Sequence, residues 1–212
     1  GDGVELLYIP RGGSDAPPTI ESVTSHGHCI RMKGKEVFKL AVRAMDEAAR
    51  QALLYKAYAR AKSEFQFSYD SYMIVRAMKE GWAPNPLHTV LEFLNSAEFL
   101  IFARRLTGEP TVNRVSAQGT RYRAGQFLTR HQDREDNENR VCAFVINLSK
   151  NWDSDWGGLL QFHDDADRLV DSFVPYWNTL SLFRVPQSHT VSLVAPWAGA
   201  DRLAITGWFL AD

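Results

Sequence analysis

The sequence predicts an α+β fold in which helices come first and an antiparallel β-structure follows. Between residues 36 and 61, apolar side chains recur every three or four positions among charged ones, the pattern of an amphipathic helix. After Pro110 the sequence changes to short β-branched and aromatic runs, which are broken by polar residues or glycines. Such runs, with no helical pattern between them, indicate an antiparallel sandwich or barrel and not a βαβ fold.

The remaining elements follow from local signals. A short apolar run at residues 4–10, within a Gly- and Pro-rich segment, predicts a strand followed by loop. A second helical stretch covers residues 87–106 and is interrupted at Asn95-Ser96. Asn95 is expected to cap the helix that follows, because Glu98 stands three residues on. Strands are predicted over 111–116, 119–123, 140–148, 158–163, 169–174, 178–184, 189–195 and 202–210.

Length and composition limit the classes of protein. A chain of 212 residues favours one domain with an appendage over two full domains. Its 24 Lys and Arg against 25 Asp and Glu leave no general basic field, so direct DNA binding is not expected. No apolar run approaches the roughly 18 residues of a membrane span, and no signal-peptide pattern opens the chain. Two cysteines, Cys29 and Cys142, fit a reducing compartment, so a cytoplasmic location without membrane contact is expected.

One constellation in the β-rich part is suited to binding a metal. His131 and Asp133 stand at positions i and i+2, which places both side chains on one face of an extended segment. His189 opens a later predicted strand and is the natural third ligand. Two histidines and one carboxylate on one face of a metal leave other positions open, the arrangement of non-haem Fe(II) oxygenases.

The last predicted strand offers a site for an anion. Its period of two places Arg202, Ala204, Thr206 and Trp208 on one face. A guanidinium inside a barrel needs an anionic partner, because a buried unpaired Arg is costly. A dicarboxylate would supply that partner through a bidentate pair.

Segments of the β-rich part occur in the order of a known family. They are Thr120–Asp133 (TRYRAGQFLTRHQD), Asn151-Trp152 with Gly157–Phe162, Pro175–Leu180, Pro186–Val191 and Arg202–Phe209. Through them residues 55–212 resemble the 2-oxoglutarate/Fe(II)-dependent dioxygenases of the prolyl 4-hydroxylase-like branch, with the greatest similarity to the ribosomal prolyl-hydroxylase group and its bacterial relatives. The resemblance implies a double-stranded β-helix, or jelly-roll, core preceded by helices.

The resemblance also implies a set of site residues. His131, Asp133 and His189 would be the catalytic Fe(II) ligands. Arg202 would bind the far carboxylate of 2-oxoglutarate, with Tyr122 and Thr206 in the same pocket. Val145 or Asn147 stands where some relatives have a second tyrosine.

The implied activity is hydroxylation of a protein or peptide substrate at proline. It uses Fe(II), 2-oxoglutarate as co-substrate and O₂, with ascorbate as a further cofactor that the resemblance allows, and it releases succinate and CO₂. A non-catalytic metal-binding jelly-roll, acting as a sensor or degenerate module, is the alternative. A Zn(II) hydrolase could use the same three ligands, but hydrolysis needs no dicarboxylate anchor such as Arg202.

Two other histidine motifs compete with His131. His163-Asp164-Asp165 is a second His-x-Asp, and its charged surroundings predict the exposed tip of a hairpin. His26-Gly27-His28-Cys29 lacks a second ligand cluster at zinc-finger spacing and is expected to be a loop. We therefore prefer His131 as the metal ligand.

Residues 1–54 are expected to form an appended segment outside the dioxygenase domain. Gly1–Gly3 and Met32–Met45 resemble a part of β-ketoacyl-acyl-carrier-protein synthase III, a thiolase-fold enzyme. The nucleophilic Cys, the His and the Asn of that family lie outside the matching part, and Cys29 is not at a matching position. No condensing activity is therefore expected, and a fusion, a joined gene fragment and a coincidence of helix patterning all remain open.

Overall fold

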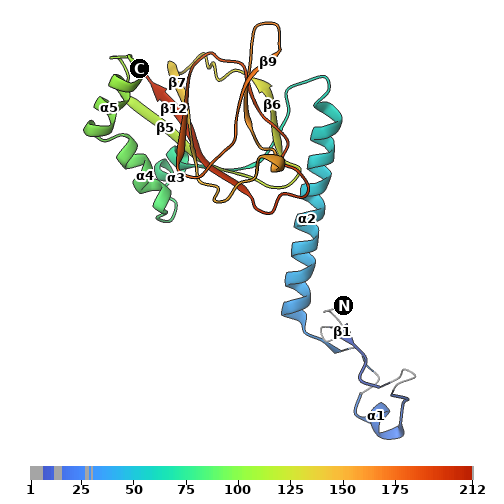
Figure 1. Ribbon diagram of the computed structural model, residues 1–212. Helices are drawn as coiled ribbons and strands as arrows, with labels where there is room; N and C mark the ends of the chain where they lie inside the picture. Colours follow the sequence, from blue (N-terminus) through green and yellow to red (C-terminus); the bar gives the residue numbers. More distant parts are fainter. Residues whose placement is uncertain (1–6, 12–15, 27–28, 30, 212) are drawn as a thin grey trace. The chain divides into compact units, whose positions relative to one another are not determined.

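The computed structural model of the protein describes residues 7–11, 16–26, 29 and 31–211 (Figure 1). Residues 4–6 of the predicted N-terminal strand, Gly1–Gly3, and Gly27 and His28 of the histidine-rich motif lie outside the described residues. The chain divides into two compact units, Gly1–Tyr55 and Lys56–Asp212. We describe each unit by itself.

The first unit holds two short strands and two helices. Strands β1 (Leu7–Tyr8) and β2 (Arg31–Met32) pair antiparallel. Helix α1 (Ile20–Thr24) begins after Thr19, whose side chain accepts the backbone N–H of Ser22. Helix α2 (Gly34–Arg60) confirms the helix predicted over residues 36–61, and its last turn belongs to the second unit.

Two five-stranded sheets form the β-structure of the second unit, and every strand pair in them is antiparallel. The first sheet has the order β10 (Thr179–Arg184), β7 (Arg140–Asn147), β12 (Arg202–Leu210), β5 (Arg114–Tyr122) and β4 (Asp70–Met73). The second has the order β3 (Phe67–Ser68), β6 (Phe127–His131), β11 (His189–Val191), β8 (Leu160–His163) and β9 (Leu169–Phe173).

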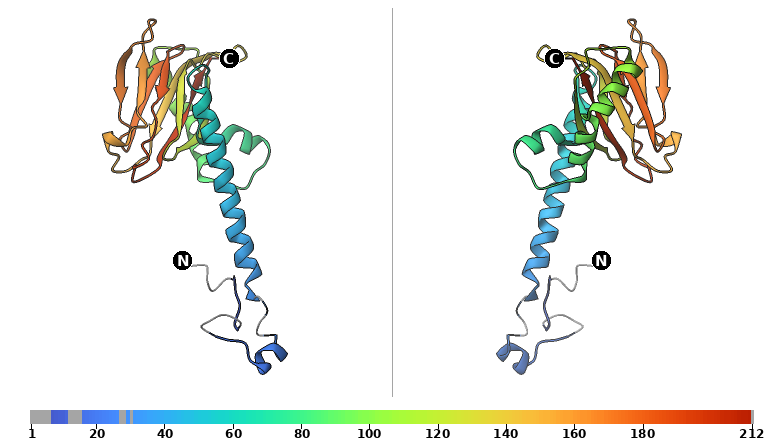
Figure 2. Two further views of the ribbon diagram at one scale, coloured as in Figure 1. Left: turned by 90° about the vertical axis from the view of Figure 1, so that its right-hand side faces the viewer. Right: turned by 90° about the vertical axis from the view of Figure 1, so that its left-hand side faces the viewer.

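The two sheets face each other across an apolar interior, and the side views of Figure 2 show them as two layers. Val145 of β7 and Ala204 of β12 pack against Leu160 of β8, and Tyr122 of β5 packs with Val191 of β11. Two facing antiparallel sheets that do not close into a barrel are the jelly-roll architecture, so the predicted fold class is confirmed.

Three helices cover the outer face of the first sheet (Figure 1): α3 (Ile74–Lys79), α4 (Pro86–Leu94) and α5 (Ala97–Thr107). Ile74, Leu91 and Ala103, one from each helix, are buried in a single apolar core. Phe144 of β7 and Phe209 of β12 complete that core from the sheet. Among the described residues, no helix combines the length and the apolar character of a membrane span.

The interruption of the predicted helix 87–106 is confirmed, but the predicted cap is wrong. Ser96 caps α5, because its Oγ accepts the N–H of Phe99 at 3.2 Å. The amide of Asn95 instead bonds both backbone groups of Val115 on β5, at 2.9 and 3.0 Å. An amide carries both a donor and an acceptor, so it can bond the C=O and the N–H of Val115 and join the helix end to the strand.

The predicted strand pattern holds with one merger and three omissions. The runs 111–116 and 119–123 join in the single strand β5, since Ala117 and Gln118 between them stay extended. The sequence did not predict β3, β4 and β6 as strands, because they are short and rich in Ser, Asp, Arg and His. Strand β6 is the important omission, because it ends at His131.

Candidate active site

Two histidines face each other on neighbouring strands of the second sheet. His131 is the last residue of β6, and His189 is the first residue of β11. The antiparallel register places them directly opposite one another, with ring centroids 4.1 Å apart. Directly opposite residues point to the same face of a sheet, so both imidazoles project into the interior between the sheets.

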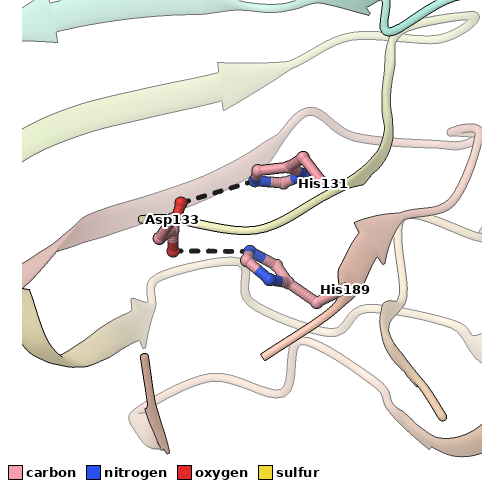
Figure 3. Close-up of side chains that lie close together, drawn as sticks. All are labelled: His131, Asp133 and His189. Carbon is pink, nitrogen blue, oxygen red and sulfur yellow. Dashed lines mark ion pairs between the residues drawn. The ribbon is translucent and has the colours of Figure 1, made fainter. Parts of the chain in front are cut away.

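Asp133 completes the group from the loop after β6 (Figure 3). One carboxylate oxygen lies 3.5 Å from Nε2 of His131, and the other lies 3.5 Å from Nε2 of His189. One ligand atom from each residue lies within 4.8 Å of the other two. In the part of the chain that the structure describes, no other cluster of His, Cys, Asp and Glu has this geometry.

Hydrogen bonds fix both imidazoles in the tautomer that a metal requires. Nδ1 of His131 lies 3.0 Å from the carbonyl oxygen of Thr129, and Nδ1 of His189 lies 2.8 Å from that of Gln187. A carbonyl oxygen can only accept, so each Nδ1 carries the proton and donates it. Nε2 of each ring, which lies on the side of Asp133, is then the nitrogen left to bind a metal.

The electrostatics favour a neutral His189 and an ionised Asp133. Burial lowers the pKa of His189, and the neighbouring His131 lowers it further, against the opposing effect of Asp133. Burial raises the pKa of Asp133, but His131, His189 and the indole of Trp208 together outweigh that effect and hold the pKa below its ordinary value. A neutral imidazole and an ionised carboxylate are the forms that bind a metal.

The three side chains line a cavity of about 190 Å³ between the two sheets. The first sheet contributes Arg202 and Thr206 of β12 and Tyr122 of β5 to the same cavity. The six residues predicted for the site therefore share one cavity. The two histidines come from the second sheet and Asp133 from the loop after β6, whereas the anion-type donors come from the first sheet.

Arg202 is a buried cation without a carboxylate partner. Its side chain is 1% exposed, and burial lowers its pKa. In the described part of the chain its Nε has no hydrogen-bond partner, and no carboxylate pairs with it. The ring of Tyr122, 5.2 Å from the guanidinium carbon, gives it cation–π contact only. A ligand carboxylate would satisfy this guanidinium in the bidentate geometry that Arg favours.

Tyr122 and Thr206 lie beside this guanidinium. Tyr122 stands directly opposite Arg202 in the pairing of β5 with β12, and burial raises its pKa. Its hydroxyl thus stays protonated and can donate a hydrogen bond to an anion. Thr206 lies on the same face of β12 as Arg202, two positions beyond Ala204, as the strand period predicts. Val145, and not Asn147, lines the cavity from β7.

Several residues of the cavity were missed by sequence reasoning. Tyr69 stacks on Tyr122 with ring centroids 4.8 Å apart, and Phe183 lies against His189 with centroids 4.7 Å apart. Phe65 and Phe67 stand at the cavity with half of each residue exposed. Nothing local distinguishes these aromatic residues from core residues, because their positions depend on strand pairings far along the chain.

The competing histidine motif lies outside the cavity. His163 belongs to β8, and its Nε2 is 3.1 Å from the hydroxyl of Thr190. It is partly buried in the strand, whereas the exposed turn predicted for its motif begins at Asp164, which pairs with Arg168 at 2.8 Å.

Comparison with known proteins agrees with this geometry. Residues 117–210, which include all six predicted site residues, match the 2OG-Fe(II) oxygenase superfamily. The chain is 34% identical over 134 residues to prolyl 3-hydroxylase OGFOD1 of Mus musculus, which is 58% of this chain and 24% of that protein. It therefore spans about a quarter of the length of that relative.

Two further similarities were found. The chain is 49% identical over 49 residues to β-ketoacyl-[acyl-carrier-protein] synthase III of Chlamydia trachomatis serovar D, covering 23% of this chain and 15% of that protein. A crystal structure of a Pseudomonas putida prolyl-4-hydroxylase aligns with a TM-score of 0.49 at 21% identity, covering 77% of this chain and 86% of that one. The family match agrees with the predicted resemblance: residues 117–210, the part of the chain that carries the site, are similar to the 2OG-Fe(II) oxygenase superfamily.

Proposed function

We propose that this chain hydroxylates a protein or peptide substrate at proline, using Fe(II), 2-oxoglutarate and O₂. The observation that carries the proposal is that two different sets of binding groups line one cavity. His131, Asp133 and His189 present three metal ligands, and Arg202 presents an unpaired buried guanidinium. A metal site alone would not need the guanidinium, and an anion site alone would not need the three ligands.

The chain's own residues have distinct tasks in this proposal. His131 and His189 hold Fe(II) through Nε2, and Asp133 holds it through a carboxylate oxygen. When bound, iron with 2-oxoglutarate and O₂ supplies the oxidation of a C–H bond, with succinate and CO₂ as products. The carbonyls of Thr129 and Gln187 keep both imidazoles in the required orientation.

The co-substrate end of the cavity positions an acid. Arg202 binds the far carboxylate of 2-oxoglutarate, and the Tyr122 hydroxyl donates a hydrogen bond to it. Thr206 offers a further hydroxyl on the same wall. Phe183, which lies against His189, keeps that side of the cavity apolar and limits the access of water.

The choice of substrate class is supported by the relative and by the cavity mouth. The mouse relative is named as a prolyl 3-hydroxylase. The half-exposed rings of Phe65 and Phe67 border the cavity and suit an apolar, ring-shaped residue of a peptide.

The release of succinate by the protein tests this proposal. The protein, supplied with Fe(II) and 2-oxoglutarate in air, should release succinate, and His189→Ala should abolish the release. Mass spectrometry of proline-containing ribosomal and elongation-factor peptides should show a product heavier by one oxygen atom, and hydroxyproline analysis should place that atom. Metal binding without any succinate, with or without peptide, would refute the catalytic proposal and leave a metal-binding module.

A further inference from the structure

We propose that Arg140 is a positioning residue for the metal ligand Asp133, acting through the backbone of the loop that joins β6 to β7. This inference rests on the proposed function, because it takes Asp133 to be an iron ligand. Arg140 determines how accurately Asp133 is held, and not whether the site binds iron.

Asp133 needs such support because it is the one ligand outside a strand. His131 ends β6 and His189 begins β11, so the pairing of these strands fixes both imidazoles. Asp133 lies in the loop before β7, where the nearest backbone pairing is an isolated bridge between Glu135 and Glu138. The position of its carboxylate therefore depends on contacts that the loop makes with other parts of the protein.

Arg140 makes the required contact with the backbone of Asp133. It is the first residue of β7, and its Nη1 donates a hydrogen bond to the carbonyl oxygen of Asp133 at 3.2 Å. Its Nε donates to a carboxylate oxygen of Glu138 at 3.0 Å, and Nη2 is 3.0 Å from the same oxygen. One planar side chain thus holds both ends of the loop at once.

The guanidinium is itself held in place by Trp208. Its central carbon lies 3.9 Å from the centroid of the Trp208 ring, which fixes the plane in which the donors point. Trp208 belongs to β12 and lines the cavity. The side chain of Arg140 is 16% exposed, so it is not one of the freely solvated surface arginines. The Asp133 backbone is thereby tied, through Arg140, to a strand that crosses the middle of the first sheet.

The contact with Glu138 alone would be an ordinary ion pair of small energetic value. The contact with the Asp133 carbonyl is different, because it acts on the backbone that carries a ligand. Loss of partners that orient metal ligands typically weakens metal binding about 10- to 100-fold. A lysine keeps the charge but has neither the planar fork nor the stacking surface, so it should restore the function only in part.

Arg140→Gln is the direct test, with Arg134→Gln as its matched control. Arg134 is an exposed residue of the same loop, so the control removes the same charge from the same region without removing the hydrogen bond to the Asp133 carbonyl. We expect Arg140→Gln to weaken Mn(II) binding by about tenfold. Electron paramagnetic resonance in anaerobic solution measures the binding. Arg140→Lys should lie between the wild type and Arg140→Gln, and Arg134→Gln should bind like the wild type.

A spectroscopic measurement separates positioning from general stability. The visible absorption of the Co(II)-loaded protein reports the arrangement of the ligands, and it should change in Arg140→Gln but not in Arg134→Gln. Circular dichroism of the metal-free proteins checks that each variant is folded. Should Arg140→Gln fail to fold, Arg140→Lys, which keeps the charge but lacks the planar fork and the stacking surface, should still show a smaller loss of Mn(II) affinity and a changed Co(II) spectrum.

The outcomes distinguish the two proposals. A folded Arg140→Gln protein with wild-type Mn(II) affinity and an unchanged Co(II) spectrum would overturn the positioning role, whatever its activity. A wild-type protein that binds Mn(II) no better than its Asp133→Asn variant would instead overturn the metal site and with it the proposed function.

Discussion

His131 and His189 lie directly opposite one another on antiparallel strands, and each imidazole lies close to a carbonyl two residues earlier in the chain. This repeated local arrangement fixes the same tautomer in both rings. The two Nε2 atoms then converge on the carboxylate of Asp133 at equal distances of 3.5 Å. Strand register and two backbone hydrogen bonds therefore bring the three side chains together in an arrangement that could hold a metal.

Removing one ligand should abolish tight metal binding, whereas removing the neighbouring histidine should not. We expect His131→Ala to weaken Fe(II) binding by more than about 100-fold, since the loss of a partner outside the ligand set already costs about 10- to 100-fold. His163→Ala is the control, because His163 bonds Thr190 on the next strand and lies outside the group. Anaerobic Fe(II) titration provides the measurement, and equal losses in the two variants would contradict this assignment.

Arg202→Met should weaken co-substrate binding and stabilise the metal-free protein. A charge-assisted hydrogen bond contributes about 1.5–3 kcal/mol, so the dissociation constant of 2-oxoglutarate should rise at least about tenfold. The unpaired guanidinium is costly to bury, so its replacement by an apolar side chain should raise the free energy of unfolding by about 1 kcal/mol or more. Calorimetric titration and urea unfolding measure the two effects. A less stable variant with unchanged 2-oxoglutarate affinity would show that Arg202 is a structural residue.

The stability of the metal-free protein should depend on pH through His189. Because burial lowers its pKa in the folded state, the unfolded chain, with a pKa near about 6.5, binds more protons as the pH falls. The free energy of unfolding should therefore decrease as the pH falls from about 6.5 through the folded pKa, by about 1.4 kcal/mol for each unit of depression. Urea unfolding in the presence of a chelator, compared with His189→Gln, isolates this contribution, and parallel pH curves would refute it. Asp133 acts in the same direction, but in a lower pH window.

Gly207 should tolerate no side chain. A Cβ at this position would collide with the Ser116 carbonyl oxygen and approach Ala117 on β5 and the ring of Phe144. Because overpacking a core costs about 1–3 kcal/mol, Gly207→Ala should lower the free energy of unfolding by about 3 kcal/mol. Gly34→Ala is the matched control, since nothing lies within 4 Å of the place that a Cβ would take there and helix α2 favours Ala. Guanidinium unfolding of both variants checks the difference.

Local periodicity carried most of what the sequence could predict. The alternation along β12 identified the face shared by Arg202 and Thr206, because successive side chains of a strand point to opposite sides whatever the strand pairs with. The spacing of the short strands predicted an antiparallel sandwich or barrel, and the family resemblance implied the jelly-roll. These are properties of neighbouring residues, and they do not depend on distant contacts.

The missed features depend on pairings between distant segments. Tyr69 reaches the cavity because β4 pairs with β5, and Arg140 reaches Trp208 because β7 pairs with β12. Asn95 has the sequence pattern of a cap, yet its amide bonds Val115 twenty residues on. In each case a local preference was compatible with several structures, and the register of a sheet selected one of them.

The binding groups of the cavity are divided between the two sheets, and this division has a consequence for stability. Neither layer holds a complete set of groups: β6 and β11 supply imidazoles, while β5 and β12 supply a phenol and a guanidinium. A molecule that bound iron at one end and Arg202 at the other would link the two sheets. Binding of such a molecule would then be linked to the stability of the domain, because it would hold the two sheets together.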